Sequence, residues 1–84
     1  MELQEIIGRR IAQLRKEKLK LSQQKFSYEA GIERSYLTRI ENGKKNISVN
    51  TLERLIKALG VSFTEFFNSK EFLERSGNEE AKSN

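Results

Sequence analysis

Apolar residues recur at helical spacing along most of this chain. Near the N-terminus, Ile7, Ile11 and Leu14 stand at positions i, i+4 and i+7, and Leu3 continues the stripe one turn earlier. The positions between them carry mainly Arg, Glu and Gln side chains. This pattern is typical of an amphipathic helix, which we predict over about residues 3–18. Alternation of β-branched and polar residues is scarce, so we expect an all-α protein.

Serines and glycines divide the rest of the chain into four shorter helices. A serine hydroxyl can accept hydrogen bonds from the first free amides of a helix, and glycine tolerates the left-handed conformation that ends one. We predict helices over about 23–30 between Ser22 and Gly31, about 34–42 before Gly43, about 49–59 between Ser48 and Gly60, and a fifth that Ser62 and Glu65 open as a capping box.

Only a few residues separate the second and third predicted helices. Such a short connection forces the two helices into a tight crossing, as in a helix-turn-helix. After Leu73 the chain has almost nothing apolar to bury. We therefore expect one domain over residues 1–73 and a flexible tail over residues 74–84.

Five polar residues share one face of the third predicted helix, within roughly 140° at about 100° per residue. They are Arg34, Ser35, Thr38, Arg39 and Asn42. The DNA major groove admits one helix, and an arginine can donate two hydrogen bonds to O6 and N7 of guanine. A polar face alone is common on surface helices. The short turn before this helix and the basic loop after it make base reading the favoured interpretation.

The composition adds mainly exclusions. The chain has no Cys and no His, so we expect no disulfide, no metal site, no cofactor and no enzymatic activity. No apolar run approaches the roughly 18 residues of a membrane span, and no signal-peptide core is present, which predicts a cytoplasmic protein. The formal net charge of +4 suits a polyanionic partner, although many soluble domains are as basic.

The segment from Leu21 to Gly43, with its Ser-Gln, Ala-Gly and Ile-Glu-Asn-Gly motifs, resembles the helix-turn-helix of the Cro and phage-repressor family, the Xre type. The likeness covers about residues 6–67 and continues through Asn-Ile-Ser48, Thr-Leu-Glu53 and Ala-Leu-Gly-Val61. It implies a compact five-helix, lambda-repressor-like domain that binds double-stranded DNA with its second and third helices. The run from Arg34 to Ser48 is also similar to controller proteins of restriction–modification systems.

The resemblance assigns roles to single residues. Gln23 matches a position that binds a backbone phosphate, although it could instead help to cap its own helix. Tyr36 matches a position where the hydroxyl reaches phosphate or the ring serves the core alone. The base-reading positions are matched by Arg34, Ser35, Thr38 and Arg39, and the phosphate-holding loop is matched by Lys44, Lys45 and Asn46. A solvated charged loop would have the same composition as this last segment.

Arg15 and Glu41 match a family ion pair that joins the first helix to the third. The chain departs from the family pattern in two places. The stretch from Lys18 to Ser22 is one residue longer than the usual Lys-Gly-Leu-Ser and lacks the glycine. Glu33 also replaces the usual Ser, Thr or Asp before the third helix, and Glu is a poorer cap.

The C-terminal part of the predicted domain is rich in apolar residues. We expect Phe66 or Phe67 to serve the core, and the dimer interface is predicted to involve Phe66, Phe67, Phe72 and Leu73. A two-fold homodimer would present its reading helices about 34 Å apart to a pseudo-palindromic operator.

Two other classes of protein remain open from the sequence. The chain could be a DNA-binding antitoxin whose phenylalanine-rich end binds a toxin, or a protein-interaction module that has lost DNA binding. The intact face with Arg34 and Arg39 argues against the second. RNA polymerase is a further candidate partner of a transcriptional regulator, and the sequence favours neither activation nor repression.

Overall fold

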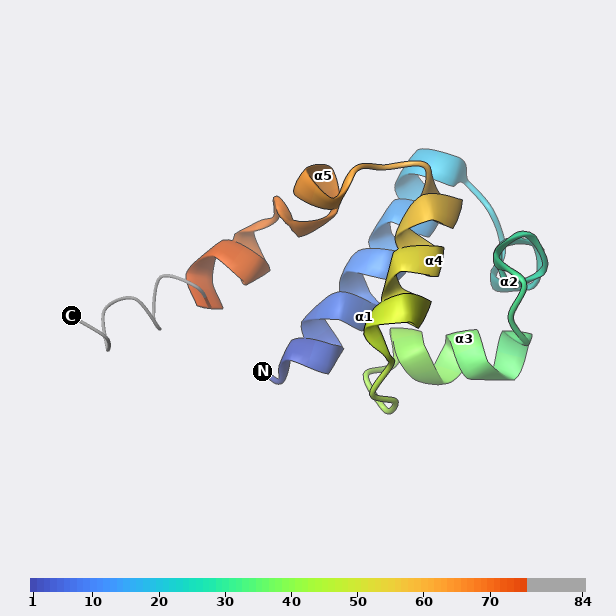
Figure 1. Cartoon of the computed structure of the whole chain (residues 1–84), viewed down its shortest axis with the longest axis horizontal. Coiled ribbons are helices and arrows are strands. Elements are labelled where there is room, and N and C mark those ends of the chain that lie inside the picture. Colours follow the sequence, from blue (N-terminus) through green and yellow to red (C-terminus); the bar gives the residue numbers. More distant parts are fainter. Residues whose placement is uncertain (76–84) are drawn as a thin grey trace.

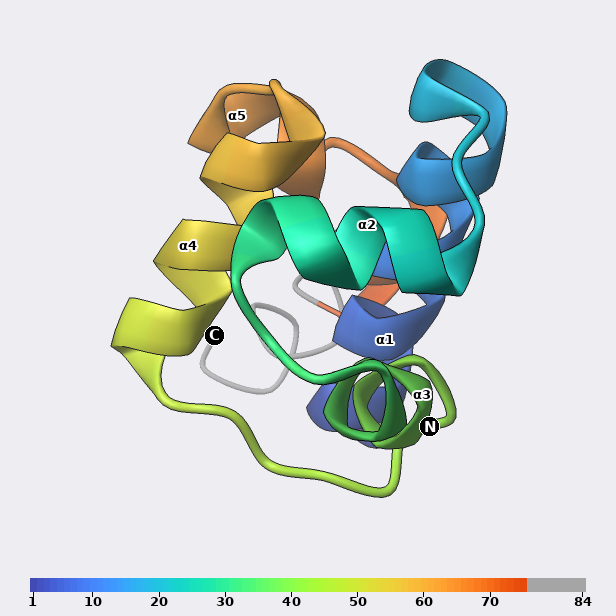
Figure 2. The ribbon, with the colours of Figure 1, turned by 90° about the vertical axis from the view of Figure 1, so that its right-hand side faces the viewer.

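The computed structural model describes residues 1–75 and contains no strand within them. The helical elements follow in chain order: α1 (Leu3–Leu14), the π-helical turn η1 (Arg15–Leu19), α2 (Gln23–Ala30), α3 (Arg34–Glu41), α4 (Val49–Leu59) and α5 (Phe63–Phe67). A further helical turn covers residues 70–75. Helix α1 packs against α3 and α4, and α2 crosses next to α3 at one end of the molecule (Figures 1 and 2). The expected compact all-α fold is therefore confirmed.

The predicted serine caps are present in the structure. Each serine hydroxyl accepts a hydrogen bond from the backbone amide three residues after it. Lys25 donates to Ser22 at 3.1 Å, Thr51 to Ser48 at 3.0 Å and Glu65 to Ser62 at 3.0 Å. Their agreement with the predicted helix starts shows how strongly local capping chemistry decides where these helices begin.

The junction between α1 and α2 explains the departure from the family pattern. The helix of α1 continues into the wider π turn η1, after which Lys20 adopts the left-handed conformation with φ of 55°. The amides of Lys20 and Leu21 both donate to the carbonyl of Arg15. A π turn holds one more residue than an α turn, so it takes up the extra residue, and a lysine occupies the left-handed position that glycine would fill at less cost.

The core lies between α1, α3, α4 and α5, and Phe26 of α2 enters it fully buried. Its most deeply buried residues are Ile11, Phe26, Leu37, Ile40, Leu55, Ile56, Leu59 and Phe66. The predicted stripe of α1 is wrong in one detail, because Ile6 is buried whereas Ile7 is only partly buried and Leu3 is exposed. Ile6 borders a surface depression that the 70–75 turn also lines, so this turn covers a side of α1 that the sequence pattern left open.

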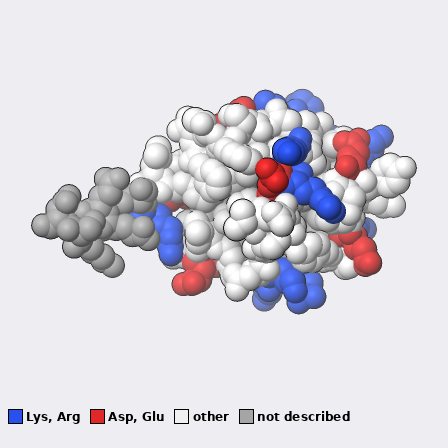
Figure 3. All heavy atoms as spheres, in the orientation of Figure 1, with Lys and Arg blue, Asp and Glu red and all other residues white. Residues whose placement is uncertain are grey.

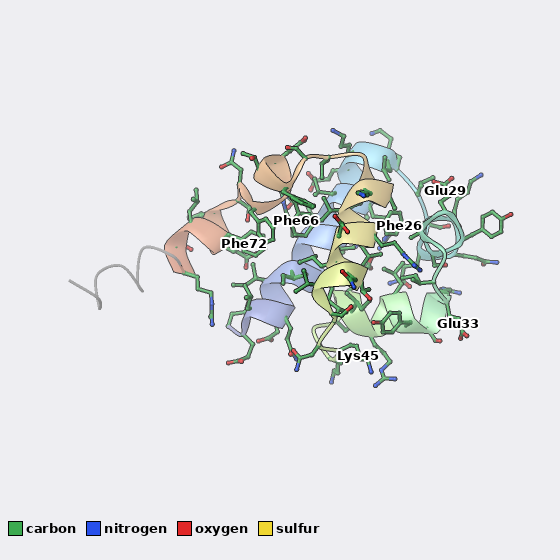
Figure 4. All side chains as sticks on the ribbon, in the orientation of Figure 1. Phe26, Glu29, Glu33, Lys45, Phe66 and Phe72 are labelled. Atoms are coloured by element: carbon green, nitrogen blue, oxygen red, sulfur yellow. The ribbon has the colours of Figure 1, made fainter. Side chains whose placement is uncertain are left out.

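The end of the described chain folds back on the domain. Phe72 packs beside Phe66 and Phe67, with ring centroids 6.0 Å and 5.0 Å away, and Figure 4 shows the labelled Phe66 and Phe72 close together. Arg75 donates to the carbonyl of Met1 at 2.8 Å. Glu74 and Arg75, assigned to the tail from the sequence, thus continue the last helical turn, and the rest of that tail lies outside the described residues.

This arrangement buries two of the four residues predicted for the dimer interface within the domain itself. Phe66 and Phe72 are only 0% and 8% exposed within one chain, so they leave little surface for a partner. Phe67 and Leu73 remain exposed. None of the helices within residues 1–75 is both long and apolar enough to cross a membrane.

Candidate nucleic-acid interface

Helices α2 and α3 form a helix-turn-helix at the surface. Gly31 ends α2 with φ of 73°, and the amide of Ile32 donates to the carbonyl of Ser27 at 3.0 Å. Helix α3 then begins at Arg34 after an extended Glu33 whose side chain makes no capping hydrogen bond. Helix α3 therefore begins without the capping hydrogen bond that Ser, Thr or Asp would provide, as the sequence suggested.

The two sides of α3 differ as predicted. Leu37 and Ile40 are buried in the core. The exposed residues on the other side are Arg34, Ser35, Arg39 and Asn42, while Thr38 is partly buried beside α2. Figure 2 shows α3 along its axis, with α2 above it and the loop that follows α3 below it. Long donor side chains and short hydroxyl side chains therefore share the open side of one short helix.

The cations of this side are available to a partner. Within residues 1–75, no acidic side chain forms an ion pair with Arg34, Arg39, Lys44 or Lys45. Lys and Arg atoms project below α3 and the loop after it (Figure 3), where Figure 4 labels Lys45. Glu33 lies at the other end of α3 in the same view. Positive charge is thus concentrated where the resemblance places base and phosphate contacts.

A buried ion pair holds α3 against the end of α1. Arg15 Nε and Nη2 donate to the two carboxylate oxygens of Glu41 at 2.7 Å and 2.8 Å. The two side chains are only 6% and 5% exposed. Arg15 Nη1 also donates to the carbonyl of Leu21 at 2.8 Å. The pair implied by the resemblance is therefore present, and it fixes both α3 and the chain that leads into α2.

Gln23 connects this ion pair to Thr38 of α3 by hydrogen bonds. Its Nε2 donates to Glu41 Oε1 at 2.8 Å, and its Oε1 accepts a hydrogen bond from Thr38 Oγ1 at 2.9 Å. From the sequence, Gln23 was expected either to bind a phosphate or to cap its own helix. This link between α2 and α3 was not predicted. An amide nitrogen carries two N–H groups, and within residues 1–75 only one of the two on Gln23 has a hydrogen-bond partner.

The loop after α3 is tied to α1 and to Tyr36. Gly43 has φ of 73°, and its carbonyl accepts a hydrogen bond from Gln4 Nε2 at 2.8 Å. Lys45 Nζ lies 5.9 Å from the centre of the Tyr36 ring, within reach of a cation–π interaction. Tyr36 itself is partly buried against the core. Neither of these two contacts was predicted, because no local sequence pattern indicates that Gln4 binds the loop or that Lys45 lies near the Tyr36 ring.

Comparisons with known proteins agree with this geometry. A helix-turn-helix family profile matches residues 11–66. The control protein C.MunI of Mycoplasma sp is 41% identical over 64 residues, which cover 76% of this chain and 86% of that protein. The crystal structure of the restriction-modification controller protein C.AhdI from Aeromonas hydrophila matches with a TM-score of 0.70 at 33% identity, covering 76% of this chain and 91% of that one. The wild-type restriction-modification controller protein C.Esp1396I gives a TM-score of 0.75 at 29% identity, over 89% and 91% of the two chains.

These matches extend across the helix-turn-helix and the helices that support it, and they agree with the resemblance carried by the segment from Leu21 to Gly43. The chain belongs to the Xre-type helix-turn-helix family of DNA-binding transcriptional regulators and is similar to restriction–modification controller proteins.

Proposed function

We propose that this protein is a homodimeric transcriptional regulator that binds a pseudo-palindromic operator with α3 in the major groove. The observation that carries the proposal is the open side of α3, where Arg34 and Arg39 have no acidic partner within residues 1–75 and flank the hydroxyls of Ser35 and Thr38. Short hydroxyl side chains let the helix backbone approach the bases, and the arginines reach further into the groove. Each bidentate arginine–guanine contact contributes about 1–3 kcal/mol of discrimination.

Phosphate contacts on both sides of α3 would hold it in register. At the start of α2, the free N–H of Gln23 and the helix dipole favour an anion. On the other side, the candidate donors are Tyr36, Lys44, Lys45 and Asn46. Roughly 6–10 such contacts per dimer would make binding strong and steeply dependent on salt.

The homodimer would use an apolar groove between α4 and α5. Its lining includes Val49, Leu52, Ile56, Phe63 and Phe67. Val49 is 82% and Phe63 is 53% exposed, and these are large apolar surfaces for a single domain to leave in water. The lining includes no residue of α3 or of the basic loop, so a second copy seated there leaves both DNA-binding surfaces free.

We further propose that the regulated genes belong to a restriction–modification system, because the relatives named above are control proteins of this kind. An antitoxin would use the same apolar groove for a toxin rather than for a second copy. The oligomeric state of the isolated protein distinguishes the two, since an antitoxin of this kind needs the toxin to cover the groove.

Selection of bound duplexes from a random DNA pool at physiological salt tests the proposal, because non-specific phosphate binding is weakened there. We expect a two-fold-symmetric motif whose half-sites are about 34 Å apart, one helical turn. Failure of a folded sample to enrich any sequence would contradict sequence-specific binding. An enriched motif without symmetry would contradict the dimer.

A further inference from the structure

Thr38 differs from the polar residues on the open side of α3, because within residues 1–75 it alone among them has side-chain hydrogen-bond partners. Thr38 Oγ1 donates to Gln23 Oε1 at 2.9 Å or to the backbone carbonyl of Arg34 at 3.0 Å. A hydroxyl has one proton and two acceptor lone pairs. Both protein partners are acceptors, so whichever one takes the proton, the oxygen offers only a lone pair to any further group.

The Gln23 amide oxygen reinforces this polarity beside the Arg34 carbonyl, and the buried ion pair decides how the Gln23 amide is oriented. The Glu41 carboxylate accepts two hydrogen bonds from Arg15. A carboxylate accepts hydrogen bonds and cannot donate them. The NH2 end of the Gln23 amide must therefore face Glu41, as it does at 2.8 Å, and the oxygen end must face Thr38. Turning the amide over would set its oxygen against a carboxylate inside the protein.

We propose that Thr38 contacts one base pair in each half-site as a hydrogen-bond acceptor, from the exocyclic amino group of adenine or cytosine. In the major groove, the donors are adenine N6 and cytosine N4, whereas guanine O6 and N7 and thymine O4 are acceptors. Gln23 acts as a positioning residue that, with the Arg34 carbonyl, keeps the Thr38 proton turned toward the protein. This inference rests on the proposed function, because it requires α3 to lie in the major groove.

The test begins with operator selection by the wild-type protein, by Thr38→Val and by Thr38→Ser. Valine keeps the shape of threonine and removes the hydroxyl, whereas serine keeps the hydroxyl and removes the methyl group. We expect Thr38→Val to lose its preference at one base pair per half-site and Thr38→Ser to keep it. If no base pair changes between wild type and Thr38→Val, the hydroxyl contacts no base and the inference is wrong.

Base analogues at that position then identify the polarity of the contact. Deoxynebularine in place of adenine, or a pyrimidin-2-one in place of cytosine, removes only the exocyclic amino group from the groove. The wild-type protein and Thr38→Ser should bind the matching analogue about 3- to 10-fold more weakly per half-site, the range of one neutral hydrogen bond. Thr38→Val should bind it as tightly as the natural duplex, which controls for the weakened base pair.

A Thr38 hydroxyl that donates to a base, rather than accepting from one, would give a different result with base analogues. If the wild-type protein tolerates loss of the amino group but loses affinity when the partner base lacks its carbonyl oxygen, then the hydroxyl donates and the inference is overturned. 2-Aminopurine for guanine and 5-methylpyrimidin-2-one for thymine provide that comparison. The analogue duplexes are measured with the wild-type protein, so this arm stands even if a variant folds poorly. Failure of the wild-type protein to select any operator is a separate result that rejects the proposed function itself.

Discussion

Gly8 of α1 lies directly against the carbonyl oxygen of Ile40 in α3. A Cβ built on Gly8 would collide with that oxygen and would come within 3.1 Å of the Glu41 carbonyl. The backbones of α1 and α3 therefore approach each other more closely than any residue other than glycine at position 8 would allow. This contact sets the distance between α1 and α3, about two helical turns before Arg15, which pairs with Glu41 of α3.

Gly8→Ala should destabilise the protein by about 1–3 kcal/mol, the usual cost of overpacking. The direction is informative, because the same change in an exposed helix stabilises by up to about 1 kcal/mol. Urea unfolding followed by circular dichroism measures the difference. Gly60→Ala is the control, since its new Cβ meets nothing within 4 Å and strains only a backbone with φ of 75°. A Gly8→Ala variant more stable than wild type would show that the two helices are not in close contact.

Removing one member of the Arg15–Glu41 pair should cost about 3–5 kcal/mol of unfolding free energy, because the remaining charge stays buried without its partner. Arg15→Met is the test variant, and Arg15→Met with Glu41→Leu should recover part of the loss. The matched control is Arg9→Met. Arg9 pairs with Glu71 at 3.3 Å, but the two side chains are 63% and 39% exposed, so the expected cost is only about 0–1 kcal/mol. Equal losses for the two arginines would contradict a special role for the buried pair.

Lys20→Gly should stabilise the protein by about 1 kcal/mol. Lys20 has φ of 55° at the end of η1, and a side chain in the left-handed region costs roughly 1–2 kcal/mol that glycine avoids. Lys16→Gly within η1 is the comparison and should destabilise by about 1 kcal/mol. Thermal unfolding of both variants separates them by sign. A destabilised Lys20→Gly would mean that the lysine side chain makes a contribution larger than the backbone strain.

The sequence predicted features of the fold that depend on neighbouring residues. A helix start needs only a serine and the amides that follow it, so Ser22, Ser48 and Ser62 marked their helices correctly. The burial of Ile6 and Phe72 was not predicted, because it depends on the 70–75 turn folding back across α1. Helical periodicity identifies an apolar stripe, but it does not say which distant segment will cover the residues beside it.

In the candidate site, too, features set by neighbouring residues were predicted and contacts between distant residues were not. The shared face of Arg34 and Arg39 follows from helix geometry alone, and α3 has that geometry. The hydrogen bonds from Gln23 to Glu41 and from Thr38 to Gln23 join residues 18 and 15 positions apart. Such contacts depend on how closely α2 and α3 cross. Sequence reasoning could assign the residue types to DNA binding, but it could not predict which hydrogen-bonding groups the protein itself would occupy.

Introducing charge into the α4–α5 groove should separate the proposed dimer. Val49→Glu and Phe63→Glu are suitable because each residue opens its helix, where a negative charge is favoured by the helix dipole. We expect the double variant to remain folded and to sediment as a monomer at micromolar concentration, with the wild type as a dimer. Tyr28→Glu is the control, because Tyr28 is an exposed aromatic residue of α2 outside the groove. A double variant that stays dimeric would place the interface elsewhere.

Arg39→Ala and Lys44→Ala should weaken DNA binding in different ways. Loss of an arginine that reads a base should lower affinity for the selected operator by about 1–3 kcal/mol per half-site and leave random duplex almost unchanged. Loss of a lysine that contacts phosphate should weaken both duplexes similarly and reduce the slope of log K against log salt by about 0.9 per subunit. Titrations of both duplexes at several salt concentrations distinguish these results. Equal losses on operator and random DNA for Arg39→Ala would contradict base reading by Arg39. An unchanged salt slope for Lys44→Ala would show that the basic loop is solvated in the complex.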